Sequence, residues 1–190
     1  GGFLGISNSV LVTPFFDASN ANVLALEFRH FYLNYGEDNT YVVGRIGFGD
    51  WQVIAEHHES TGKWEHVILD ISSFAAGKSH CQIGFLYDDK NEWAWGWGVD
   101  DVHIYKPEAG NISGTVTLAL TSTPLADVEI KISREEFSRT TMTNSNGEYK
   151  FSNIFEGKYT VTASLFNIEK VTSSVMVESD RMDTLNFALS

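Results

Sequence analysis

The sequence lacks several features that would fix a class of protein at once. It has one cysteine, three prolines and only 13 lysine and arginine residues, against 25 aspartate and glutamate residues. A single cysteine excludes an intramolecular disulfide, and we expect Cys81 to be a buried thiol. The formal net charge of −12 repels phosphate, which excludes electrostatic binding of nucleic acid and polybasic docking on anionic membranes. No run of about 18 apolar residues occurs, so we expect no membrane insertion.

The chain is instead rich in the residues that build a packed core. Hydrophobic residues make up 43% of the 190 residues and aromatic residues 13%, which is ample for one large or two small domains. Residues 1–5, GGFLG, contain no methionine, basic region or long apolar segment. We therefore expect a processed or excised piece rather than an intact signal peptide.

The composition changes sharply near Pro107. All five tryptophans, all six histidines and the cysteine precede this residue, and none follows it. Six basic and 14 acidic residues give residues 1–107 a charge of −8, whereas seven and 11 give residues 108–190 a charge of −4. A proline and a glycine stand between two strand-like runs in the segment 106–110, as in a linker. The sequence therefore predicts two domains, residues 1–107 and residues 108–190.

Both halves are predicted to be all-β. Threonine, valine, isoleucine, phenylalanine and tyrosine recur with a period of two, and no amphipathic helical pattern exceeds about three turns. In the first half we expect strands at Val10–Thr13, Val23–Phe31, Thr40–Ile46, Trp51–His57, Trp64–Ile71, Cys81–Leu86 and Trp97–Tyr105. In the second we expect strands at Ile112–Leu120, Asp127–Ser133, Arg139–Thr143, Tyr149–Asn153, Gly157–Leu165, Val171–Val177 and Leu185–Leu189. Seven short strands in about 80 residues indicate a small sandwich, with a hairpin turn at Ser145-Asn146-Gly147.

No familiar catalytic motif is present. The sequence has no His-Glu-x-x-His, no Gly-x-Ser-x-Gly, no phosphate-binding glycine loop and no Cys–His pair at a familiar spacing. His57 and His58 are neighbours on a predicted strand, so their side chains point to opposite faces and cannot easily share a metal ion. We expect them to be a surface pair, and we expect the chain not to be an enzyme.

Three indoles alternate with small residues in the stretch 93–98, WAWGWG. Alternation places Trp93, Trp95 and Trp97 on one face. Indole faces stack on the apolar faces of sugars, so Trp93 and Trp95 are candidate ligand-binding residues. The alternative is core packing, which we expect for Trp97 and which stays open for the other two.

Two acidic segments are candidate Ca²⁺ sites. Asp88 and Asp89 belong to an oxygen-rich loop that lacks the EF-hand spacing, and solvated loop charges are the commoner explanation for such a run. At Asp100 and Asp101 the alternation of apolar residues slips by one position, which predicts a β-bulge. Such a bulge would turn one carboxylate inward, where it needs either a structural Ca²⁺ or several N–H donors.

The first half resembles the cleaved-adhesin and MAM-like jelly-roll domains of secreted bacterial peptidases and adhesins. The resemblance covers about residues 10–105 and lies in Leu11-Val12-Thr13-Pro14 followed by Asp17, Leu24–Phe28, Trp64 with Leu69-Asp70-Ile71-Ser72, and Gly98-Val99-Asp100-Asp101-Val102. It implies a jelly-roll-type β-sandwich with a further strand ahead of this first element. Only nine residues precede Val10, so we expect the first strand to be cut off or supplied from elsewhere, which leaves an exposed edge. The resemblance also implies Ca²⁺ binding by Asp100 and Asp101.

The second half resembles the carboxypeptidase regulatory-like domain, a transthyretin-like sandwich. The matching motifs are Ile112-Ser113-Gly114-Thr115-Val116, Pro124-Leu125 with Val128-Glu129-Ile130, the segment 143–151, TNSNGEYKF, and Gly157-Lys158-Tyr159-Thr160-Val161. This pattern covers nearly all of residues 110–190. The resemblance implies a seven-stranded sandwich that serves as an appended, non-catalytic module for folding, spacing or attachment.

These observations predict a non-catalytic, extracellular accessory or binding region of a larger secreted bacterial protein, either a peptidase or an adhesin. The expected location is secreted or at the cell surface. The expected partner is the catalytic domain of the parent protein or a neighbouring subunit, with a glycan or a host extracellular protein as further possibilities. Two alternatives remain open: a carbohydrate-binding module that uses Trp93 and Trp95, and a structural subunit that assembles by strand complementation.

Overall fold

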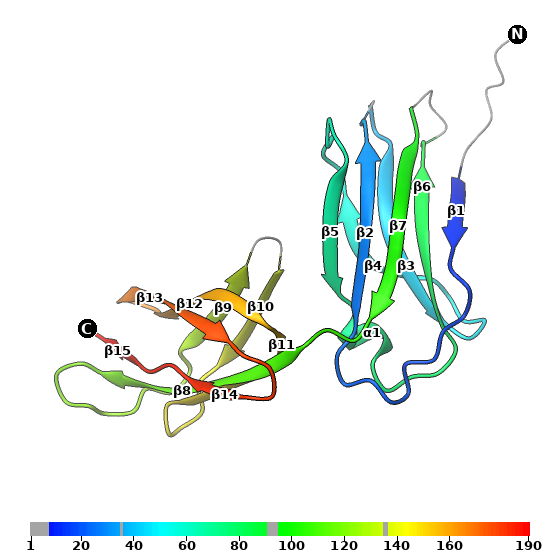
Figure 1. Ribbon diagram of the computed structural model, residues 1–190. Coiled ribbons are helices and arrows are strands. Elements are labelled where there is room, and N and C mark those ends of the chain that lie inside the picture. The colour runs from blue at the N-terminus through cyan, green and yellow to red at the C-terminus, as the bar shows by residue number, and fades with distance from the viewer. Residues whose placement is uncertain (1–7, 35, 91–94, 135–136) are drawn as a thin grey trace, which may run out of the picture. The chain divides into compact units, whose positions relative to one another are not determined.

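The computed structural model describes residues 8–34, 36–90, 95–134 and 137–190. The described chain is almost entirely β-strand and divides into two compact units, residues 1–106 and residues 107–190. The all-β prediction is confirmed, and each unit is a sandwich of two sheets (Figure 1). Among the described residues no helix is both long enough and apolar enough to span a membrane.

The first unit packs a four-stranded sheet against a three-stranded one. The strands are β1 (Asn8–Val12), β2 (Ala25–Tyr32), β3 (Asn39–Ile46), β4 (Gln52–His57), β5 (Glu65–Asp70), β6 (Cys81–Asp88) and β7 (Trp97–Tyr105), with a short helix α1 (Ser72–Ala75) after β5. The larger sheet has the order β1-β6-β3-β4 and the smaller one β5-β2-β7. All neighbouring strands are antiparallel. The seven predicted strands therefore all occur, with ends that differ by a few residues.

Alternate side chains of β2 point inward and form part of the interior of the first unit. Leu26, Phe28 and Tyr32 are fully buried, and Arg29 between them is exposed. Phe28 meets Phe85 of the opposite sheet with ring centroids 5.1 Å apart. Phe74 of α1 covers the far end of the same core, where Gly44 leaves room for its ring. Cys81 is a buried free thiol, as predicted.

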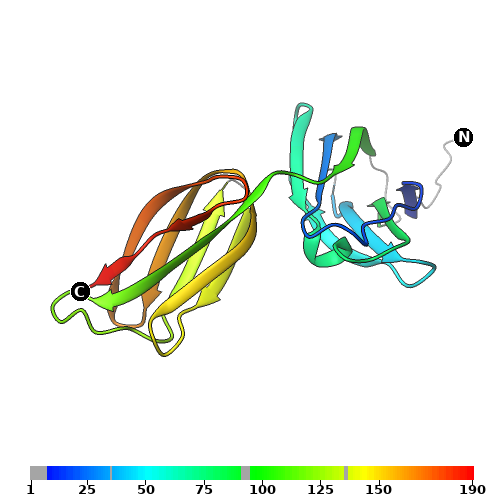
Figure 2. The same ribbon diagram turned by 60° about the horizontal axis from the view of Figure 1, so that its bottom comes forward.

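The second unit has two sheets around a closed apolar core. Its strands are β8 (Ala109–Leu118), β9 (Glu129–Arg134), β10 (Phe137–Met142), β11 (Glu148–Phe155), β12 (Gly157–Leu165), β13 (Ile168–Val177), β14 (Met182–Thr184) and β15 (Phe187–Leu189). One sheet has the order β10-β9-β12-β13, and in the other β8 pairs with β11 on one side and with β14 and β15 on the other. The predicted last strand is thus two short strands, both parallel to β8. Figure 2 shows these red strands alongside the green β8.

The turn at Gly147 differs from the predicted hairpin. Gly147 has φ +72°, and the side-chain Oδ1 of Asn144 accepts hydrogen bonds from the backbone N–H groups of Asn146 and Glu148. The local turn chemistry is therefore as predicted. The strands on either side, β10 and β11, belong to different sheets, so the turn carries the chain from one layer to the other rather than closing a hairpin.

Candidate functional site

The predicted β-bulge lies in the middle of β7. Glu27 pairs with His103 and Arg29 pairs with Asp100, so two β7 residues, Asp101 and its neighbour, face one residue of β2. Asp101 has φ +53°, and its backbone N–H donates to Oδ1 of Asp100 at 2.8 Å. The slip in the apolar alternation therefore identified a real bulge.

The expected inward carboxylate at this bulge is wrong. Asp100 and Asp101 are both exposed. Asp100 lies opposite Arg29, which is also exposed, so the extra residue of the bulge is accommodated on the solvent side of the sheet. Among the residues that the structure describes, no cation lies within ion-pair distance of either carboxylate. Two exposed carboxylates therefore lie in the middle of β7, an edge strand within the described residues.

The other two predicted metal ligands lie at the end of β6, where Asp88 is the last residue of the strand and Asp89 follows it. Asp88 accepts hydrogen bonds from the backbone N–H and the Nζ of Lys90, at 3.0 and 2.6 Å, and these bonds lower the pKa of the Asp88 carboxyl. Asp89 is buried. Within the described ranges no group of three or more His, Cys, Asp and Glu side chains is placed to hold a metal ion. The four aspartates are therefore not gathered into one cluster within the described residues, and Ca²⁺ binding stays a prediction.

The tryptophans separate into different environments. Trp93 lies outside the described residues. Trp95 is 64% exposed, whereas Trp97 packs against the core with its ring 5.6 Å from that of Phe85. Core packing is thus confirmed for Trp97. A further indole, Trp64, is 46% exposed on the outer face of the smaller sheet.

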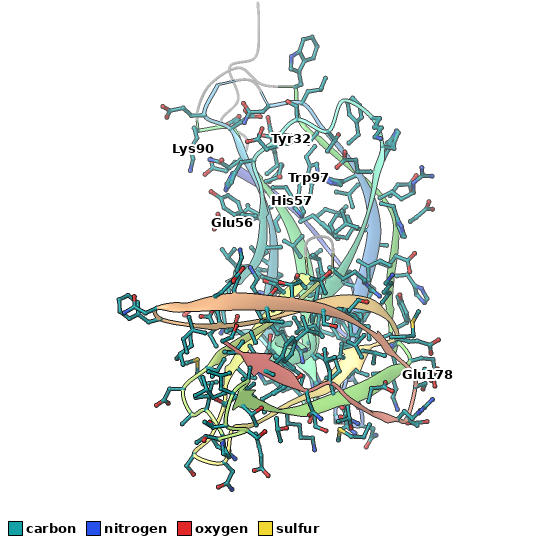
Figure 3. All side chains as sticks on the ribbon, turned by 90° about the vertical axis from the view of Figure 1, so that its left-hand side faces the viewer. Tyr32, Glu56, His57, Lys90, Trp97 and Glu178 are labelled. Carbon is teal, nitrogen blue, oxygen red and sulfur yellow. The ribbon has the colours of Figure 1, made fainter. Side chains whose placement is uncertain are left out.

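Two histidines missed by the sequence analysis lie inside the first unit beside Trp97. His30 of β2 and His57 of β4 face each other from opposite sheets, with ring centroids 4.8 Å apart. The indole Nε1 of Trp97 donates to Nδ1 of His30 at 3.1 Å, which leaves the proton of a neutral His30 on Nε2. The Nε2 atom of His57 is buried and has no hydrogen-bond partner among the described residues. Figure 3 labels His57, Trp97 and Tyr32 at this end of the sandwich.

Burial keeps both imidazoles neutral. Desolvation, together with the smaller effects of the neighbouring His30 and His58, lowers the pKa of His57 to about 4. Desolvation also lowers the pKa of His30, against the opposing effect of Glu65. Near this pair, burial and the adjacent Asp38 raise the pKa of Tyr32, whose hydroxyl donates to the Asp38 carbonyl at 2.7 Å. The interior of the first unit therefore keeps these titratable groups in their neutral forms.

The expected surface pair is wrong for His57 and right for His58. His58 is exposed, with Nδ1 2.6 Å from Asn39 and Nε2 2.9 Å from Glu56. His57 takes the inward position, directly opposite the buried Thr40 of β3. The signal for His30 was available in the sequence, because it continues the inward alternation of Leu26 and Phe28.

Strand β7 of the smaller sheet and strand β1 of the larger one are both edge strands in the part of the chain that the structure describes. Within the described residues β7 pairs only with β2, and β1 pairs only with β6. Leu11 pairs with Phe85, whose side chain is in the core, so Leu11 faces the same way. It is nevertheless 60% exposed. An apolar side chain on the core side of a sheet is thus left open to solvent.

The family model of the carboxypeptidase regulatory-like domain matches residues 111–190. No curated protein matches the chain in sequence. The resemblance of residues 10–105 to cleaved-adhesin and MAM-like domains stays a prediction.

Solved structures with similarity to the chain include surface and binding proteins of bacteria. The minor pilin GBS52 of Streptococcus agalactiae is 10% identical with a TM-score of 0.41, over 89% of this chain and 84% of the pilin. The Bacillus anthracis TIE protein is 13% identical with a TM-score of 0.40, over 95% of this chain and only 37% of that protein. A proposed carbohydrate-binding protein of Pseudomonas aeruginosa is 14% identical with a TM-score of 0.37, over 44% of this chain and 90% of that one. The match of residues 111–190, nearly all of the second unit, to the carboxypeptidase regulatory-like domain is the specific result of these comparisons.

Proposed function

We propose that the chain is a non-catalytic, extracellular accessory region of a larger secreted bacterial protein, a peptidase or an adhesin, and that it acts by binding and spacing. The observation that supports this most is the match of residues 111–190 to a family of appended modules. The first unit supplies the binding surface in this proposal, because it carries the exposed indole, the open edge and the exposed carboxylates of β7.

Cys81, His30 and His57 of the first unit have structural roles in the interior. Cys81 is buried, its Sγ lies 3.4 Å from the Lys78 carbonyl, and burial raises the pKa of its thiol, which disfavours the nucleophilic thiolate. His30 accepts a hydrogen bond from the indole of Trp97. The Nε2 atom of His57 is buried and has no hydrogen-bond partner among the described residues. None of these groups is placed to act on a substrate in solution.

An assay of the purified chain against casein and a mixed fluorogenic peptide library tests the proposal. We expect no turnover above that of a Cys81→Ala variant purified in the same way. Turnover shared by both preparations marks a contaminating protease. Turnover by the unaltered chain that is lost in Cys81→Ala or in His57→Phe would overturn the proposal.

A second candidate function is carbohydrate binding through Trp95, which the exposure of its indole favours. Trp93, proposed with it from the sequence, belongs to the segment that the structure does not describe. A glycan array probed with the chain and with Trp95→Ala tests this candidate, and Trp64→Ala is the matched control on the outer face of the smaller sheet. Binding that is lost only in Trp95→Ala supports the candidate, and an array without binding rejects it.

A further inference from the structure

The two sheets of the first unit do not have the same width. Phe85 of β6 packs on Trp97 of β7, with ring centroids 5.6 Å apart, so β6 lies across the core from β7. The larger sheet continues beyond β6 to β1, whereas the smaller sheet ends at β7. No described strand therefore lies across the core from β1. Figure 1 shows β1 at the margin of the unit.

The position beside β7 and across the core from β1 has apolar side chains on its inward face. Leu11 faces the core side of β1 and is 60% exposed. A strand beside β7 would cover it, because stacked sheets lie about 10 Å apart and their inward side chains interdigitate. On the β7 side, Val99 pairs with the buried His30, so it too faces inward, and it is only half-buried. The gap thus offers apolar side chains on both sheets.

The same position is acidic along its rim. Asp100 and Asp101 stand exposed at the centre of β7 without an ion-pair partner in the described part of the chain. Natural proteins use edge charges and bulges to prevent unspecific strand pairing. An incoming strand must therefore match the bulge and offset the two negative charges, which selects for a lysine or arginine opposite them.

We propose that β7 is a docking edge for an extended segment of a partner polypeptide. This inference deepens the proposed binding role and rests on it. The segment adds a fourth strand antiparallel to β7, with alternate apolar side chains over Leu11 and Val99 and a basic residue at the Asp100–Asp101 bulge. Backbone hydrogen bonds to β7 give affinity, and the cation at the bulge gives selectivity.

A second copy of this chain does not meet that requirement through the same edge. Antiparallel pairing of two β7 strands would bring four carboxylates, Asp100 and Asp101 from each copy, to the centre of the new ladder. Like charges opposite each other destabilise a strand pair. The occupant is therefore a different, basic segment.

Two labelled nine-residue peptides test the proposal with the intact chain. Both alternate valine and threonine, and one has lysine at its centre where the other has glutamate. We expect saturable binding of the lysine peptide by fluorescence anisotropy, and about tenfold weaker binding of the glutamate peptide. Hydrogen exchange should slow within residues 97–105 when the lysine peptide is bound. Absence of saturable binding, or equal binding of both peptides, overturns the proposal.

Variants locate the binding site. Asp100→Lys, whose new charge Asp101 cancels, should abolish the preference between the two peptides, and Asp100→Asn, which keeps an acceptor for the Asp101 N–H, should reduce the preference. Asp50→Lys, at an exposed turn of the same unit, is the control with the same change of charge and should leave the preference intact. Leu11→Lys should weaken binding of the lysine peptide, whereas Met176→Lys, at a similarly exposed position of the second unit, should not.

Sedimentation velocity separates the other occupants. The proposal expects a monomer that binds peptide, and self-association that Leu11→Lys abolishes would instead assign the edge to a second copy and overturn it. The peptide experiment and the turnover assay are independent. A chain that shows no turnover and binds neither peptide rejects the docking edge and leaves the accessory role. Turnover that Cys81→Ala or His57→Phe abolishes rejects the accessory role, whatever the peptides do.

Discussion

The two units complete the same two-layered architecture in different ways. In the second unit the last segment of the chain returns and lies parallel to β8 as β14 and β15, so the sheet is filled from within. In the first unit no described segment fills the position beside β7. Leu189 at the end of β15 is consequently fully buried, whereas Leu11 on β1 is 60% exposed. The second unit thus completes its sheet with its own last strands, whereas the first unit leaves the β7 edge that we propose as a docking site.

The interiors differ as well. The second core is built from aliphatic and aromatic residues and contains no histidine, because that half of the sequence has none. The first core contains His30 and His57 in contact. One unit should therefore respond to acid through its core, and the other should not.

The largest expected effect is the loss of stability when the core of either unit is truncated. Ile83 in the first unit and Ile132 in the second are both fully buried. Truncating either to alanine should lower the free energy of unfolding of its own unit by about 3 kcal/mol, or about 15 °C in Tm. Because every tryptophan belongs to the first unit, indole fluorescence should report Ile83→Ala and miss Ile132→Ala, which calorimetry detects. A fluorescence shift in Ile132→Ala would show that the two units unfold together.

Acid should sharpen the contrast between the cores. The folded state holds the pKa of His57 at about 4, below its ordinary value of 6.5, so between these values the unfolded chain binds more protons. The stability of the first unit should be intact above pH 6.5 and should fall as the pH drops toward 4, by about 3 kcal/mol from this group. The lowered pKa of His30 adds to the fall in the same direction.

The His57→Phe variant tests the origin of this acid sensitivity. Phenylalanine cannot take up a proton, so the variant should lose most of the fall contributed by His57 in a series of thermal melts followed by tryptophan fluorescence. His58→Phe, which changes the exposed neighbour and removes only its smaller effect on His57, should keep most of the acid sensitivity. Equal behaviour of the two variants would contradict the assignment to the buried imidazole.

The sequence specified the strands better than the side-chain environments. Period-two alternation located every strand of the first unit, and the slip at Asp100 and Asp101 located the bulge, because both are local properties of the chain. The direction of a carboxylate at the bulge depends on which side of the sheet faces solvent, and no local pattern contains that information. The burial of His57 likewise depends on His30, 27 residues earlier in the chain and on the opposite sheet.

The smallest expected effect concerns Ca²⁺. Because Asp88 is bound to Lys90 and both Asp100 and Asp101 point to solvent, the carboxylates are not gathered around one position. With a dissociation constant no tighter than about 1 mM, addition of 1 mM Ca²⁺ should stabilise the first unit by at most about 0.4 kcal/mol. Melts with Ca²⁺ and with chelator should therefore nearly coincide for both units. If chelation destabilises the first unit alone and Asp100→Asn removes the difference, the bulge carboxylates bind the metal, and the β7 edge would then be bridged by a cation rather than by a basic strand.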